Sequence, residues 1–104
     1  MAITNDYISK MKTSLRITSE DTSFVTDVTD LIEAAQADLI LAGVLPDKAH
    51  SESDSLIQRA VATYCKANFG LANPDMEAYT ESYLSQKKTL LLTKEYTTAT
   101  VVTP

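Results

Sequence analysis

The fold of this chain is decided by residues 56–70, LIQRAVATYCKANFG. Apolar side chains recur there every three or four residues, which is the spacing of one face of an α-helix. Gly70 then supplies the left-handed backbone conformation that ends many helices. The stretch predicts a helix from about Asp54 to Phe69 with a wide apolar face, which consists of Ile57, Ala60, Val61, Tyr64, Cys65 and Phe69.

Two more helices are predicted before this stretch. The first begins at Thr4 or Asn5, whose side-chain oxygen can accept from a free backbone amide, and it ends near Leu15. The second follows a polar loop and runs to about Ala42, where Gly43 supplies another stop. Its apolar stripe consists of Phe24, Val28, Leu31, Ala35, Leu39 and Ala42, with Ile32 beside it.

Residues 45–53 and the segment after Gly70 complete the pattern. Residues 45–53 are polar, so we expect an exposed connection that is the most mobile loop of the chain. A fourth helix begins at residues 73–75, Asn-Pro-Asp, because asparagine caps helices and proline suits the first turn. It runs to about Leu92. Its stripe consists of Met76, Tyr79, Tyr83, Leu84, Leu90 and Leu91, with Lys87 near the middle.

The C-terminal residues have a different composition. Residues 96–103 are mostly threonine and valine, which favour extended structure. We expect residues 94–104 to form an extended β-prone arm that adds a strand to a neighbour or lies along a groove, with a frayed terminus as the alternative. The predicted fold class is therefore all-α: a compact bundle of about four helices in a single domain, residues 1–93, followed by this arm.

Length and composition limit the class of protein. A chain of 104 residues that is 44% hydrophobic fits one compact domain and leaves little room for two. No apolar run approaches the roughly 20 residues that a membrane-spanning helix needs, so an integral membrane protein is excluded. The single cysteine cannot form an intramolecular disulfide, and the N-terminal residues do not resemble a secretory signal. We expect synthesis in the cytoplasm.

The charge is unevenly distributed. The net charge is −5, and residues 20–54 hold nine acidic side chains against one base, Lys48, whereas the flanking segments are mildly basic. Such a chain is not suited to tight binding of nucleic acid, because phosphate binding needs a concentrated basic surface. The acidic second helix and the weakly basic first and fourth helices could attract each other between copies of the chain, in a head-to-tail contact. The alternative is that the charges only keep the domain soluble.

No catalytic or metal-binding pattern is visible. His50 lies in a polar connection, and Cys65 lies on the apolar side of its helix, so both are interpreted as non-catalytic residues. A structural zinc site would need about four cysteine or histidine ligands. Both glycines are explained as helix stops, so there is no phosphate-binding glycine loop. We expect no enzyme activity, no cofactor and no metal.

Some side chains are better explained by contacts between proteins. Ile40 and Leu41 point away from the main stripe of the second helix, which indicates either an interface or ordinary exposed aliphatic residues. The fourth helix and the arm contribute further candidates. The complete set of candidate assembly contacts is Ile40, Leu41, Lys87, Tyr96, Val101 and Val102.

Several short strings are familiar from one protein family. They are Tyr7-Ile8, Leu15-Arg16-Ile17, Asp30-Leu31-Ile32-Glu33-Ala34-Ala35, Ala42-Gly43-Val44, Leu56-Ile57 with Ala60, Tyr64-Cys65-Lys66-Ala67-Asn68-Phe69-Gly70, and Asn73-Pro74 with Tyr83. With the order of helices, they resemble the head-tail connector proteins of long-tailed double-stranded DNA bacteriophages. These are also called adaptor, head-completion or DNA packaging proteins. The resemblance runs from about Asn5 to Tyr96.

The resemblance implies a mostly helical virion protein at the head-tail junction, made in the bacterial host cytoplasm. About a dozen copies would form a ring beneath the portal protein and contact a tail or stopper protein, with DNA passing through the bore. The family has no catalytic residues to transfer. An acidic channel wall fits this role, because it would let DNA slide without sticking.

Other functions are compatible with the same residues. The main alternative is a small prophage-encoded helical adaptor or regulator that binds one protein partner as a monomer or dimer. A helix-turn-helix DNA reader fits less well, because the connection after Gly43 is long and the following helix is not basic. An enzyme would require turnover that depends on His50 or Cys65.

Overall fold

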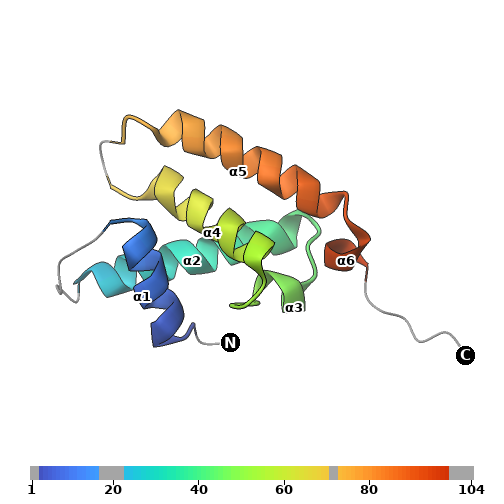
Figure 1. The fold of residues 1–104 in the computed structure, drawn as a ribbon, viewed down its shortest axis with the longest axis horizontal. Coiled ribbons are helices and arrows are strands. Elements are labelled where there is room, and N and C mark those ends of the chain that lie inside the picture. Colours follow the sequence, from blue (N-terminus) through green and yellow to red (C-terminus); the bar gives the residue numbers. More distant parts are fainter. Residues whose placement is uncertain (1–2, 17–22, 71–72, 99–104) are drawn as a thin grey trace, which may run out of the picture.

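The computed structural model of the chain describes residues 3–16, 23–70 and 73–98, and every regular element in these ranges is a helix (Figure 1). This confirms the all-α class and the compact bundle. The helices are α1 (Asn5–Ser14), α2 (Ser23–Ala42), α3 (Pro46–Ala49), α4 (Ser55–Asn68), α5 (Met76–Leu91) and α6 (Lys94–Thr97).

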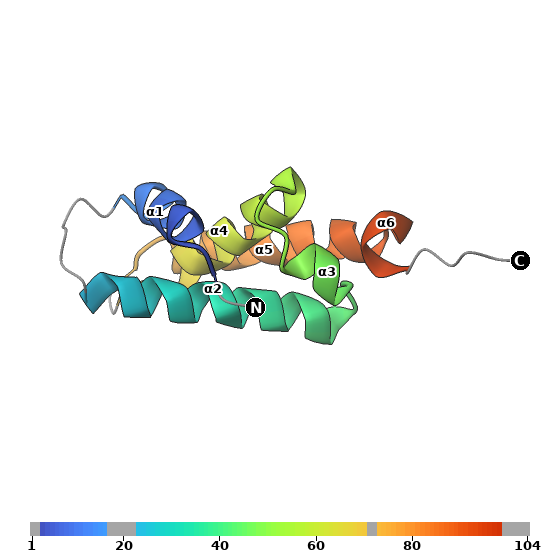
Figure 2. The ribbon, with the colours of Figure 1, turned by 90° about the horizontal axis from the view of Figure 1, so that it is seen from below.

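The central helix is α4, which both α2 and α5 pack against (Figure 1). α1 contacts α2 and α4, and the Lys10 ammonium donates to Gln58 Oε1 of α4 at 2.8 Å. Seen from below, α2 lies along one side of the molecule and α1 toward the other (Figure 2). Among the long helices, α5 packs mainly on α4, so it forms an edge of the bundle.

The centre of the core lies between α1, α2 and α4, and α3, α5 and α6 add buried side chains to it. Ile32 is fully buried, and burying a side chain of this size stabilises a fold by about 1.5–3 kcal/mol. It therefore belongs to the centre of the α2 stripe rather than beside it, whereas Ala42 at the end of α2 is exposed. The fully buried core side chains are Val28, Ile32, Ala35, Leu39, Ala49, Ile57, Ala60, Val61 and Cys65.

The predicted helix ends are confirmed where local chemistry sets them. Thr4 caps α1, since its hydroxyl accepts from the Tyr7 amide at 3.2 Å. Asp54 caps α4 by accepting from two backbone amides at 3.0 and 3.1 Å. After α2 and α4, Gly43 and Gly70 have φ values of +127° and +86°, which residues with a Cβ rarely adopt.

The connection of residues 45–53 differs from the prediction. It contains α3, which begins at Pro46 because proline fits the first turn of a helix. Ala49 of α3 is fully buried in the core, so the connection is not simply an exposed polar loop.

The C-terminal segment also differs from the prediction of an extended arm. Residues 94–97 form α6 instead of extended structure, and Tyr96 is 4% exposed. The Tyr96 carbonyl accepts from the Leu45 amide at 2.8 Å, and its hydroxyl lies 3.1 Å from each Asp54 carboxylate oxygen. Burial of one aromatic ring overrides the β-propensity of its neighbours. Residues 99–104, with Val101 and Val102, lie outside the described residues, and the division of the chain at residue 93 stays a prediction.

The stripe predicted for α5 is only partly buried. Tyr83 and Leu90 are buried, whereas Met76 and Leu84 are about half exposed, because α5 has one long neighbour to cover it. The helix also begins later than its capping sequence. Asn73 instead closes a turn: its Oδ1 accepts from the Asp75 amide at 3.0 Å.

Candidate assembly surfaces

Two larger hollows at the Phe69 end of α4 are the main features of the described surface. One is lined by the end of α1 together with α4 and α5. The other is lined by α2 and the end of α4. Since α1 and α2 are different neighbours of α4, the two hollows have different characters.

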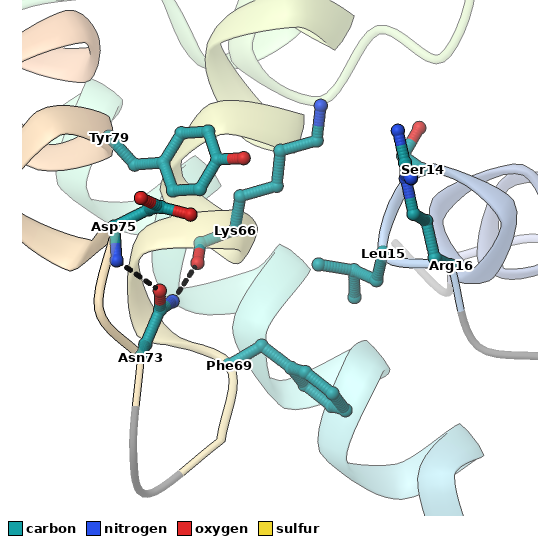
Figure 3. Close-up of a pocket in the computed structure, with 8 residues that line it drawn as sticks. All are labelled: Ser14, Leu15, Arg16, Lys66, Phe69, Asn73, Asp75 and Tyr79. Carbon is teal, nitrogen blue, oxygen red and sulfur yellow. Dashed lines mark hydrogen bonds between the residues drawn. The ribbon is translucent and has the colours of Figure 1, made fainter.

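The surface on the α1 side is a cavity of about 490 Å³, here called the basic cavity (Figure 3). The side chains of Arg16 and Lys66 extend in the same direction from the end of α1 and from α4 (Figure 3). The Lys66 ammonium lies 6.0 Å from the ring centroid of Tyr79. The basic cavity is lined by Ser14, Leu15, Arg16, Lys66, Phe69, Asn73, Asp75 and Tyr79.

The walls of the basic cavity are held by backbone contacts. Asn73 Nδ2 donates to the Lys66 carbonyl at 2.6 Å, which ties the start of the α5 segment to α4 (Figure 3). Arg16 has a φ of +60°, an uncommon value for a residue with a Cβ. The left-handed turn ends α1 and places the guanidinium at the mouth of the cavity. Arg16 and Lys66 outnumber Asp75, the acidic side chain of the lining, so the opening suits a carboxylate or another anion.

The surface on the α2 side is a groove of about 570 Å³, here called the acidic groove. The rings of Phe24 and Phe69 form its apolar part, with centroids 6.0 Å apart. Asp27 and Asp30 line it and are exposed. The full lining is Phe24, Asp27, Asp30, Leu31, Ala34, Asn68, Phe69 and Gly70. A carboxylate rim beside an aromatic floor suits a basic segment with an apolar side chain.

A smaller pocket of about 230 Å³ continues this side between α2 and α5 and contains the bridge between them. Asp38 of α2 accepts from the Tyr83 hydroxyl at 2.5 Å and from the Lys87 ammonium at 3.0 Å. Partial burial opposes the charge of Asp38, but these hydrogen bonds outweigh it and hold the pKa of its carboxyl below the ordinary value. Burial and the bond to Asp38 raise the pKa of Tyr83.

The far ends of α2 and α5 carry exposed leucines. Leu41 is 88% exposed and Leu92 is 78% exposed. The two helix ends lie close together, since a Cβ on Gly43 would be 3.4 Å from Leu91 Cδ2. This corner, opposite the Phe69 end of α4, is a third candidate contact surface.

Cys65 and His50 occupy structural positions. Cys65 is fully buried, and burial raises the pKa of its thiol to about 12, so the thiolate needed for nucleophilic attack is scarce. His50 follows α3 as its C-terminal cap. Within the described residues, no three His, Cys, Asp or Glu side chains are grouped to hold a metal ion.

The structure places four of the six predicted contact residues. Leu41 is exposed, whereas Ile40 is partly buried and packs against the core. The Lys87 ammonium is engaged by Asp38, and the ring of Tyr96 serves the core of its own subunit. An assembly role for these residues stays a prediction.

Both hollows were missed as sites by sequence reasoning. The sequence shows the charges that line them, but the residues come from four helices, α1, α2, α4 and α5, that are separated in the sequence. Phe69 lines both, although its place on the apolar face of the helix predicts only a core residue. The unusual positive φ of Arg16 has no signal in the sequence.

The model of the family described as phage connector protein matches residues 8–97, which is most of the chain. The chain belongs to the phage connector family. No curated protein and no solved structure matches it significantly. As a phage connector protein, the chain has a structural role in the virion, where it assembles with other virion proteins. No helix in the described ranges is both long and apolar enough to cross a membrane.

Proposed function

We propose that this connector chain forms a ring of about a dozen copies beneath the portal protein, and that the ring forms part of the DNA channel between capsid and tail. The family match over residues 8–97 carries the proposal. The ring places the chain at the head-tail junction, with the portal on one side and a tail or stopper protein on the other.

The two different sides of the subunit support a ring. The basic cavity and the acidic groove differ in charge, so a copy can pair one side with the opposite side of the next copy. Head-to-tail contacts of this kind close into a ring when the rotation between copies divides a full turn. A symmetric dimer would use the same surface twice.

The charge supports passage of DNA without tight binding. The net charge is −5, and α2 exposes Asp27, Asp30 and Glu33. Binding of DNA strengthens with each phosphate that a basic side chain neutralises, so an acidic wall keeps DNA free to slide. Sequence-specific recognition is not part of the proposed role.

The corner with Leu41 and Leu92 supports a contact with another virion protein. Two large, exposed apolar side chains from neighbouring helix ends are suited to burial against a partner. The portal protein and the tail or stopper protein are the proposed partners of this corner.

Electron microscopy of the chain mixed with the portal protein of the same phage tests the proposal. We expect a second ring, coaxial with the portal ring and one subunit layer thick. One or two copies bound to the portal, or a dimer that does not bind the portal, would instead support the small adaptor and contradict the ring.

A further inference from the structure

We propose that the basic cavity and the acidic groove are the two halves of the contact between neighbouring copies. In this contact, Arg16 and Lys66 of one copy face Asp27 and Asp30 of the next. The inference rests on the proposed ring and names the surfaces that close it.

The placement of the hollows supports a side-by-side contact. Both are lined by Phe69, so they lie at the same end of α4. The basic cavity is bounded by α1 and α5, and the acidic groove is bounded by α2. In a ring whose axis is parallel to α4, the two hollows would lie at the same height, and the basic cavity of one copy could meet the acidic groove of the next.

The charges choose between this contact and a symmetric one. Arg16, Asp27 and Asp30 are exposed, and Lys66 is half-buried at the cavity. Pairing two acidic grooves places like charges together, which costs several kcal/mol across an interface. Two basic cavities would also repel each other, because Arg16 and Lys66 outnumber Asp75 in each lining. Pairing opposite sides removes that repulsion.

The contact also has an apolar centre. Phe24, Leu31 and Phe69 contribute to the acidic groove, and Leu15 contributes to the basic cavity. Stable interfaces combine a buried apolar centre with a polar rim, and the four charged side chains would supply that rim. The apolar area provides affinity, and the charges set the orientation of the neighbour.

Charge reversal of each side separately tests the contact. One variant carries Arg16→Glu and Lys66→Glu, and the other carries Asp27→Lys and Asp30→Lys. We expect each alone to weaken ring formation at least about tenfold, measured by native mass spectrometry with and without portal protein. Circular dichroism checks that both variants fold, and Lys94→Glu on α6 is the matched control that should assemble normally.

Mixing the two variants gives the decisive result. The unchanged acidic groove of the first fits the unchanged basic cavity of the second, and the two reversed sides also have opposite charges. We therefore expect mixed rings to form from variants that do not assemble alone. A symmetric contact would also gain from pairing the opposite charges of the two variants, but it would give two-membered pairs and no closed ring.

A cysteine pair provides an independent measurement. A chain with both Arg16→Cys and Asp27→Cys should form covalent ladders of many copies under oxidation, whereas each single variant should stay monomeric because its cysteine faces no second cysteine across the contact. Cys65 can remain because it is fully buried. Two results would overturn this contact and leave the ring intact. One is normal ring formation by each charge-reversed variant alone. The other is a double-cysteine variant that stops at dimers. Absence of any wild-type assembly, alone or on portal protein, would overturn both.

Discussion

Individual tyrosine hydroxyls connect the helices of this subunit. Tyr83 and Tyr96 each donate to a carboxylate, Asp38 and Asp54 respectively. Tyr7 is also a buried residue, but its hydroxyl has no hydrogen-bond partner within the described residues. A buried polar group without a partner opposes folding, whereas a bond to a charged acceptor favours it.

Replacing these hydroxyls should therefore have opposite consequences. Tyr96→Phe removes the bonds to Asp54 and should lower the free energy of unfolding by about 1–2 kcal/mol. Tyr7→Phe is the matched control, since Tyr7 is 3% and Tyr96 4% exposed, and it should leave stability unchanged or slightly raised. Urea unfolding measures both. Equal losses of unfolding free energy in the two variants would show that the hydrogen bonds of the Tyr96 hydroxyl do not cause its contribution to stability.

The Asp38 bridge makes stability depend on pH. The pKa of Asp38 is lower in the folded chain than in the unfolded one, so its contribution is present above the unfolded value, about 4, and is lost as the pH falls through the folded value. Asp38→Asn should cost about 1 kcal/mol at pH 7 and reduce the loss of stability below pH ~4. Glu33→Gln changes an exposed carboxyl on the same helix, and it should alter neither the stability at pH 7 nor the loss of stability below pH ~4.

At the scale of elements, the sequence predicts those helix ends that are set by residues close by in the chain. The ends of α1, α2 and α4 could be predicted because Thr4, Gly43 and Asp54 act on their own neighbours in the chain. α6 could not, because it forms around the burial of Tyr96 against residues about 40 to 50 positions earlier. The exposed fraction of the α5 side chains likewise depends on which helices surround α5, and the apolar pattern of α5 itself does not contain that information.

The C-terminal helix should be essential to the subunit. A chain that ends at Thr93 loses the buried ring of Tyr96 and the bond from the Leu45 amide, which should cost about 3–5 kcal/mol. A chain that ends at Thr98 keeps these contacts and should unfold within about 0.5 kcal/mol of the full chain. Thermal unfolding distinguishes the two. A stable chain without α6 would contradict its place in the core.

Residues 99–104 are expected to act in assembly rather than in folding. The chain that ends at Thr98 should have full helix content but bind the portal or tail protein more weakly, because it lacks Val101 and Val102. Co-sedimentation with each partner measures this. Unchanged binding would remove the C-terminal residues from the mechanism.

At the scale of the whole molecule, the sequence predicts the charge imbalance but not where it lies. The nine acids of residues 20–54 are evident in the sequence, yet only the packing of α1, α2 and α5 around α4 separates the groove of Asp27 and Asp30 from the cavity of Arg16 and Lys66. The family resemblance supplied the function class, which the residues alone do not reveal.

The side-by-side contact should weaken with salt. Ions screen exposed charge pairs, and the screening length falls from about 10 Å at 0.1 M to about 3 Å at 1 M salt. We expect fewer rings at 1 M than at 0.1 M sodium chloride by analytical ultracentrifugation. Rings that strengthen with salt would indicate a purely apolar contact.

The mass of the chain bound to its portal protein tests the central claim most directly. A closed ring of about twelve subunits of 11.4 kDa adds a single discrete increment of about 140 kDa to the portal ring. Native mass spectrometry resolves that increment. An added mass of one or two subunits, or none, would contradict the account of this chain as a ring-forming connector.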